Sequence, residues 1–241
     1  MERWRKSLNR SRHVTNLENV DLVSTKKIKI NTRNVRKNKR DTKAKDKNIK
    51  EKEMVDIFKH FTFVKKYNEI KDLKEKVLKY TKEDWEKYDY RQKNYIVHSS
   101  TKTIPLIWNE MNKDNLRNLK KDDRKFWPEA EKYKTDLDSL SQMFTEKYGK
   151  GFISSAMLIN LPSRTVIKPH VDNYDPYFDL VKRTHLAIVT DDEVIFTVGG
   201  EERNIKEGEI FEIDNSNKLH SVINNSEEID RVHLLADWLT T

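Results

Sequence analysis

After Gly151 the chain divides into seven short segments that each have the pattern of a β-strand. Each segment is rich in β-branched or aromatic residues and lies between turn-forming residues, which is typical of strands in an all-β region. In chain order they are FISSAMLINL, TVIKPHVD, RTHLAIVT, EVIFTVGGEERNI, GEIFEID, KLHSVINN and RVHLLADWL, and Gly199-Gly200 predicts a hairpin turn inside the fourth. So many short strands within residues 151–241 predict an antiparallel sandwich or barrel.

Residues 51–150 have mainly helical patterns. The segments MVDIFKHF, NEIKDLKEKVLKYT and YKTDLDSLSQMFTEKYGKG place apolar residues at three- and four-residue steps, and Gly149 stands where a helix C-cap is expected. Between them, YDYRQKNYIVHSS and TKTIPLIW have the character of short strands. We therefore expect an α+β fold in which a mainly helical flank, 51–150, and the barrel strands, 151–241, form one domain, 51–241.

The first 50 residues hold the basic charge of the chain. They contain 17 Lys and Arg against 5 Asp and Glu, a net charge of +12, so the rest of the chain is net −4. Because this segment has no sustained apolar period, it cannot bury enough surface to offset the entropy of ordering, and we expect a flexible tail. Its charge suits contact with nucleic acid or another polyanion through counterion release, and a solubilising extension explains the composition equally well.

Composition excludes several classes of protein. With no Cys, the chain can form no disulfide, thiolate metal site or cysteine nucleophile, so a metal site must use His, Asp and Glu. Five Gly residues form no nucleotide-binding fingerprint. No stretch approaches the roughly 18 apolar residues of a membrane span, and the N-terminus lacks the apolar part of a secretory signal, so we expect no membrane contact and a cytoplasmic location. The oligomeric state stays open.

His170, Asp172 and His220 are candidate metal ligands. Residues i and i+2 of a strand project to the same face, so His170 and Asp172 could share one ion. With 7 His and 40 acidic residues in the chain, one such spacing is expected by chance, and a surface pair is the alternative. His220 on a neighbouring strand would complete the facial triad of two His and one carboxylate that holds Fe(II); otherwise it is a strand His beside a loop.

Two Arg residues favour the metal site. Arg183 and His185 share one face of the segment RTHLAIVT, and Arg231 begins the segment RVHLLADWL. Guanidinium groups that point into a barrel need carboxylate partners, which a dicarboxylate co-substrate would supply. The alternative is that each Arg pairs with a nearby acid such as Asp179 or Asp230.

Together, PHVD, RTHLAIV, GEIFEIDNSNKLHSVINN and RVHLLADWL resemble, in order and approximate spacing, the aspartyl/asparaginyl β-hydroxylase family of 2-oxoglutarate-dependent Fe(II) dioxygenases. The resemblance covers residues 151–241, and the combination is far more specific than any one motif. It implies a double-stranded β-helix, which is a jelly-roll or cupin-like barrel, with Fe(II) and 2-oxoglutarate as cofactors. The H-x-D of residues 170–172 is similar to that of bacterial free-amino-acid and proline hydroxylases.

Carried over to this sequence, the resemblance implies a role for each motif residue. His170, Asp172 and His220 would hold the iron and carry catalysis. Arg183 and His185 would contact the end of 2-oxoglutarate nearest the iron, and Arg231 would hold its distal carboxylate.

The implied reaction is hydroxylation of an unactivated C–H of an amino acid or a protein side chain, which consumes O2 and 2-oxoglutarate and releases succinate and CO2. We expect substrate contacts from Asn173, Tyr174, Arg91 and Trp108, and a nucleic-acid-associated target also stays open. Two other classes remain as alternatives. One is a catalytically silent jelly-roll binding module that its basic tail tethers to nucleic acid. The other is a cupin-type isomerase or lyase that uses no 2-oxoglutarate, and in such an enzyme the inward Arg residues would have no role.

Overall fold

The structure is a computed structural model that describes residues 59–109, 118–172 and 177–241, all of which belong to one compact unit, Val55–Thr241. The predicted basic tail, residues 1–50, lies outside the described residues, as do Asn173 and Tyr174. The described part mixes helices with strands, and every strand pairing in it is antiparallel. An α+β chain with antiparallel strands, as predicted, is confirmed.

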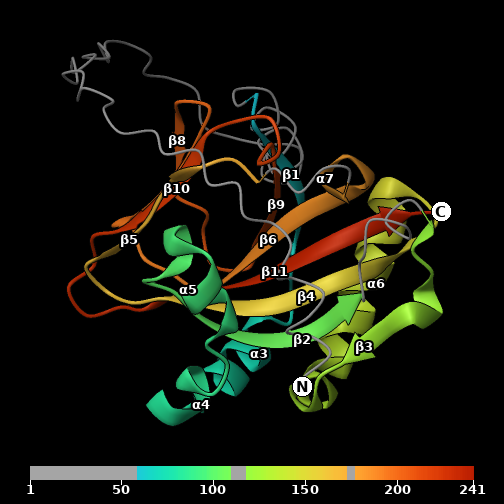
Figure 1. The fold of residues 1–241 in the computed structure, drawn as a ribbon, viewed down its shortest axis with the longest axis horizontal. Helices are drawn as coiled ribbons and strands as arrows, with labels where there is room; N and C mark the ends of the chain where they lie inside the picture. The colour runs from blue at the N-terminus through green and yellow to red at the C-terminus, as the bar shows by residue number, and fades with distance from the viewer. Residues whose placement is uncertain (1–58, 110–117, 173–176) are drawn as a thin grey trace, which may run out of the picture. The chain divides into compact units, whose positions relative to one another are not determined.

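The strands form two sheets (Figure 1). The larger sheet has the order β1 (Phe61–Lys66), β9 (Glu209–Ile213), β6 (Val181–Val189), β11 (Arg231–Thr240), β4 (Gly151–Leu161), β2 (Lys102–Asn109) and β3 (Arg124–Phe126). The smaller sheet has the order β5 (Thr165–His170), β10 (His220–Asn224), β7 (Val194–Val198) and β8 (Glu201–Arg203). All seven segments predicted after Gly151 are strands, and Gly199 and Gly200, both with positive φ, make the turn between β7 and β8.

The two sheets pack face to face around one apolar cluster. Ala187 and Phe211 from the larger sheet meet Ile167, Phe196 and Val222 from the smaller one. The two-residue alternation of a strand decides which side chains face this layer, and it turns the neighbours of Ala187 on β6 the other way. The space between the sheets is therefore packed with side chains, and the functional residues described below lie at its edge.

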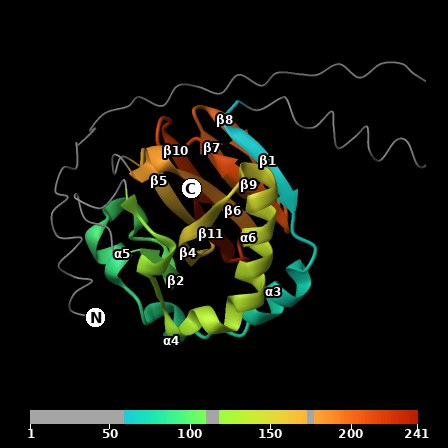
Figure 2. The ribbon, with the colours of Figure 1, turned by 90° about the vertical axis from the view of Figure 1, so that its right-hand side faces the viewer.

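Helices α3 (Ile70–Val77) and α6 (Lys134–Tyr148) cover the opposite face of the larger sheet (Figure 2). Leu73 of α3 and Leu140 of α6 are fully buried against side chains such as Leu186 of β6 and Leu234 of β11. Burial of each such side chain contributes about 1.5–3 kcal/mol to stability. Two of the three predicted helices are thus present, and Gly149 is the C-cap of α6, with φ +87°.

Residues before Gly151 supply strands as well as helices, since β1 lies at one edge of the larger sheet and β2 and β3 lie at the other. TKTIPLIW forms β2, as predicted. The remaining short elements are α4 (Lys82–Glu86), α5 (Tyr90–Asn94), α7 (Tyr177–Leu180) and the 3₁₀ helices η1 (Ile96–His98), η3 (Lys121–Asp123) and η4 (Pro128–Tyr133). None of the described helices is long and apolar enough to cross a membrane.

Two segments differ from the predictions. YDYRQKNYIVHSS was predicted as a strand but forms α5 and η1, where the Tyr95 N–H donates to the Arg91 carbonyl. Strand propensity reflects packing on a pleated, half-buried surface, and α5 has no buried residue to provide such packing. MVDIFKHF was predicted as a helix; most of it lies outside the described residues, but Phe61 at its end opens β1 and packs between the sheets.

Candidate active site

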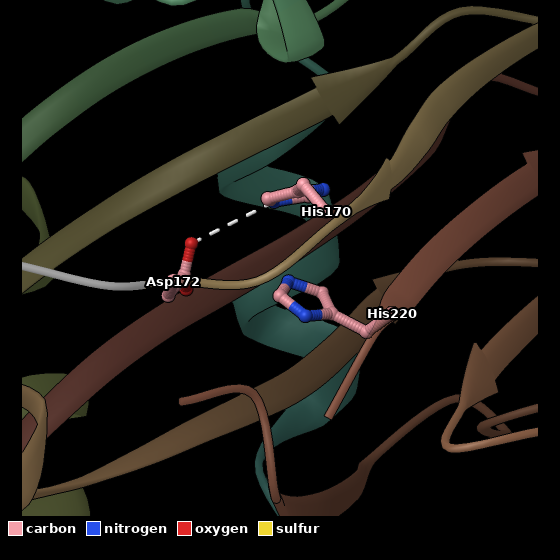
Figure 3. A group of neighbouring side chains, drawn as sticks. All are labelled: His170, Asp172 and His220. Carbon is pink, nitrogen blue, oxygen red and sulfur yellow. Dashed lines mark ion pairs between the residues drawn. The ribbon is translucent and has the colours of Figure 1, made fainter. Parts of the chain in front are cut away.

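His170, Asp172 and His220 come together where β5 ends and β10 begins (Figure 3). The register of the two strands pairs His170 directly with His220, and their ring centroids lie 4.1 Å apart. Asp172 follows β5, and its Oδ1 lies 3.6 Å from His170 Nε2. One ligand atom from each residue lies within 4.8 Å of the other two, so the three side chains could hold one metal ion.

Both imidazoles are held with one nitrogen engaged by the backbone. His170 Nδ1 lies 2.8 Å from the Lys168 carbonyl oxygen, and His220 Nδ1 lies 3.3 Å from the Lys218 carbonyl oxygen. Because a carbonyl can only accept, each Nδ1 must donate, which leaves the Nε2 lone pair of each ring free. Burial lowers the pKa of His220 to about 4 and also lowers the pKa of His170, so both rings are neutral at pH 7.

Only one oxygen of the Asp172 carboxylate, Oδ2, accepts side-chain hydrogen bonds from the described residues. Its Oδ2 accepts a hydrogen bond of 2.6 Å from Arg183 Nη1 and one of 2.5 Å from Asn215 Nδ2, and its backbone N–H donates to the Asn215 carbonyl. Burial alone would raise the pKa of Asp172, but the Arg183 guanidinium holds it well below its usual value. Asp172 is therefore an anion whose Oδ1 faces the two histidines.

Arg183 is shared between two carboxylates. Its Nε and Nη2 donate to the two carboxylate oxygens of Asp237 at 2.7 and 2.8 Å, while Nη1 bonds Asp172. Asp237 is fully buried and accepts a further hydrogen bond of 2.9 Å from the Tyr177 hydroxyl. The guanidinium thus donates to the protein's own carboxylates, neither of which is Asp179 or Asp230. The expected contact of Arg183 with 2-oxoglutarate stays a prediction.

One cavity joins the three residues to further polar groups. We call it the site cavity; its lining consists of Arg91, His98, Ile159, Ile167, His170, Asp172, Arg183, His185, Phe196, His220, Val222, Arg231 and Leu235. Its polar lining thus includes every motif residue to which the resemblance gives a role.

Arg231 is a buried cation of this cavity that has no carboxylate partner among the described residues. The side chain is 1% exposed, and no carboxylate of the described residues lies within ion-pair distance of it. Its Nη2 lies 2.6 Å from His233 Nδ1, its guanidinium carbon lies 5.3 Å from the Phe196 ring centroid, and its Nε finds no partner among the described residues. Burial lowers the pKa of Arg231 to about 9, which reflects the cost of holding this charge away from water.

His185 and Arg91 bring two further polar groups to the cavity. The His185 Nδ1 is buried without a partner in the described part of the chain, and burial lowers the pKa of His185 well below its usual value. From α5, Arg91 places its Nη2 2.8 Å from His98 Nε2, while its Nη1 is buried and unpaired among the residues described. The His98 ring packs edge-on against His170, with centroids 5.1 Å apart.

The remaining predicted substrate contacts are Trp108, Asn173 and Tyr174. Trp108 on β2 packs in a separate apolar cluster with Phe152 and Tyr177 and does not line the site cavity. Asn173 and Tyr174 lie outside the described residues.

Three residues of the site were not predicted from the sequence. Asp237, Asn215 and His98 lie in quoted segments but were given no role. Asp237 could not be linked to Arg183 from the sequence, because only the register of β11 against β6 sets the two residues opposite each other. Asn215 and His98 likewise gave no local signal, because their positions depend on a loop and on a short helical turn.

Comparison with known proteins gives one match that covers most of the chain. Residues 47–240 match the family described as Aspartyl/Asparaginyl beta-hydroxylase. No curated protein matches the chain.

Several solved structures align with part of this chain at low sequence identity. A 2OG-Fe(II) oxygenase family oxidoreductase from Burkholderia pseudomallei is 14% identical, with a TM-score of 0.44, and the alignment covers 58% of this chain and 66% of that one. A prolyl-4-hydroxylase from Pseudomonas putida is 10% identical, with a TM-score of 0.47 and coverage of 76% and 94%. The non-heme monooxygenase ThoJ in its nickel complex is 13% identical, with a TM-score of 0.48 and coverage of 75% and 74%.

The family match extends from before β1 to the end of β11 and includes every residue of the site cavity. It therefore covers the N-terminal flank, which the motif resemblance did not reach. The chain belongs to the aspartyl/asparaginyl β-hydroxylase family, whose members are Fe(II)- and 2-oxoglutarate-dependent hydroxylases.

Proposed function

We propose that this protein hydroxylates an unactivated C–H of an amino acid or a protein side chain, with Fe(II) held by His170, Asp172 and His220. The two antiparallel sheets would then be the two faces of a double-stranded β-helix, with the metal at its edge. Bound Fe(II) and 2-oxoglutarate supply the oxidising power that inserts one atom of O2 into the C–H bond, with release of succinate and CO2.

The donor set fits Fe(II). Two neutral imidazoles with free Nε2 lone pairs and one carboxylate oxygen are the facial triad that leaves open positions for co-substrate and oxygen. The backbone carbonyls that fix each imidazole tautomer are the outer partners that such ligands need.

Arg231 is the observation that carries the proposal for 2-oxoglutarate. A buried guanidinium without a carboxylate is costly, and the distal carboxylate of 2-oxoglutarate would neutralise it. His185 lines the same cavity, and its Nδ1, which has no partner among the described residues, would hydrogen-bond the co-substrate. A cupin-type isomerase or lyase would leave Arg231 without a function.

Arg91 is the proposed contact for the substrate. It reaches the cavity from α5, a part of the chain that supplies none of the metal or 2-oxoglutarate contacts, and its buried Nη1 is unpaired in the described structure. Such a group suits a substrate carboxylate, such as that of a free amino acid or of an acidic side chain.

The test is anaerobic titration of the purified protein with Fe(II) and then 2-oxoglutarate, in which the visible metal-to-ligand charge-transfer band is measured. Wild-type protein should develop the band, and His220→Ala should not. His60→Ala is the matched control, because His60 pairs with Asp214 away from the site cavity and should leave the band intact. Absence of the band in wild type, or its survival in His220→Ala, contradicts the proposal and leaves the catalytically silent binding module as the better account.

A further inference from the structure

The carboxylate ligand of the proposed metal centre is braced by a chain of buried groups. Ser154 Oγ lies 3.0 Å from the Tyr177 hydroxyl, which donates to Asp237, which in turn accepts two hydrogen bonds from Arg183. Arg183 then donates to Asp172. We propose that Asp237 is a positioning residue that holds the metal ligand Asp172 through Arg183; this inference rests on the proposed function.

The geometry fixes the plane of the Arg183 guanidinium. Arg183 and Asp237 are directly opposite each other on β6 and β11, and the fork of two hydrogen bonds between them leaves the group no freedom to rotate. Nη1 is thereby aimed at Asp172 Oδ2, at 2.6 Å. With Asn215 on the same oxygen, Asp172 can present only Oδ1 to the histidines.

Charge balance gives Asp237 a second effect on the same ligand. The buried pair of Arg183 and Asp237 is neutral as a unit, so the negative charge of Asp172 stays available for a cation. Loss of the Asp237 charge would leave Asp172 as the one remaining ion-pair partner of Arg183 among the described residues. The Arg183 cation would then compete with the metal for the Asp172 carboxylate.

The experiment measures binding of Co(II), by its visible absorption, to Asp237→Asn and to a matched control, Asp136→Asn. Asp136 is also a buried carboxylate that accepts from a Tyr hydroxyl, Tyr67 at 2.8 Å, and pairs with a cation, Lys76 at 2.7 Å, but it lies outside the site cavity. Asp237→Asn should weaken Co(II) binding about 10- to 100-fold, the range for loss of an outer partner of a metal ligand. Asp136→Asn should destabilise the fold but leave Co(II) affinity unchanged.

A double-mutant cycle with Arg183→Met tests the route of the effect. If Asp237 acts through Arg183, Asp237→Asn should have no further effect on Co(II) affinity in the Arg183→Met background. A further loss of affinity there, or wild-type affinity in Asp237→Asn, overturns the inference.

Should Asp237→Asn not fold, Tyr177→Phe removes the hydroxyl bound to Asp237 but keeps every charge. About fivefold weaker Co(II) binding is then expected, the equivalent of one hydrogen bond, and unchanged binding overturns the inference. Failure of the proposed function gives a different result, because wild type and His220→Ala would then bind Co(II) equally.

Discussion

Arg231 should destabilise this protein whenever 2-oxoglutarate is absent. Burial lowers its pKa from 12.5 to about 9, and at 1.36 kcal/mol per unit this difference corresponds to a cost of about 5 kcal/mol. A cost of several kcal/mol is also typical of one buried ion. The hydrogen bond to His233 and the face of Phe196 offset part of it. Arg231→Met keeps most of the apolar stem and should therefore raise the free energy of unfolding of the ligand-free protein by about 1–4 kcal/mol.

The assay is equilibrium unfolding in urea, in a buffer that contains Co(II) but no carboxylate or phosphate ions, with and without 2-oxoglutarate. At about 100 times its Kd, 2-oxoglutarate should stabilise wild type by about 2.7 kcal/mol and should leave Arg231→Met unchanged. Addition of 2-oxoglutarate should thus reduce the difference in the free energy of unfolding between Arg231→Met and wild type, or reverse its sign. Arg124→Met is the control, since Arg124 is a partly buried cation over Phe152 outside the site cavity and its loss should not abolish the effect of 2-oxoglutarate.

Two results would refute the reasoning on Arg231. If Arg231→Met is less stable than wild type without ligand, contacts within the protein already compensate the buried charge of Arg231. The guanidinium then needs no carboxylate from a ligand. If 2-oxoglutarate stabilises both proteins equally, the distal carboxylate binds elsewhere.

Two further predictions concern the substrate and the β7–β8 turn. Arg91→Met should raise the KM for substrate about 10- to 100-fold through loss of a charged hydrogen bond, while uncoupled succinate release stays unchanged; equal loss of both activities would contradict a substrate role. Gly199→Ala should destabilise the fold by about 2–5 kcal/mol in urea unfolding, because its Cβ would lie 2.6 Å from the His60 ring in addition to the strain of a positive φ. Gly200→Ala, with open space around its Cβ, should cost only about 1–2 kcal/mol; similar losses for both would contradict the clash.

The strands and the metal-binding residues could be predicted because their signals are local. The segments TVIKPHVD and KLHSVINN located β5 and β10, although each strand is shorter than predicted and Asp172 lies two residues beyond the end of β5. The two-residue period of a strand put Arg183 and His185 on one face of β6, where both line the site cavity.

The support of the site could not be predicted, because it depends on the register between distant segments. Asp237 meets Arg183 only in the observed pairing of β6 with β11, and a slip of one residue would turn Asp237 toward the helical layer. Arg91 and His98 reach the cavity from a segment whose Tyr and Ile content suggested a strand. Because α5 and η1 are short and have few apolar contacts of their own, only their position in the folded chain brings these two side chains to His170.

The charges of the site cavity narrow the class of substrate. Among the three guanidinium groups that line the cavity, only Arg183 forms ion pairs with Asp172 and Asp237 in the described structure. Arg91 adds a third guanidinium, and the neighbouring histidines are neutral, so these groups carry a net charge of +1. A divalent cation raises the total to +3 and the 2-oxoglutarate dianion lowers it to +1. A substrate with one carboxylate near Arg91 would neutralise the cavity, whereas a neutral substrate would leave a buried cation uncompensated, so we expect an acidic substrate to bind in preference to its amide.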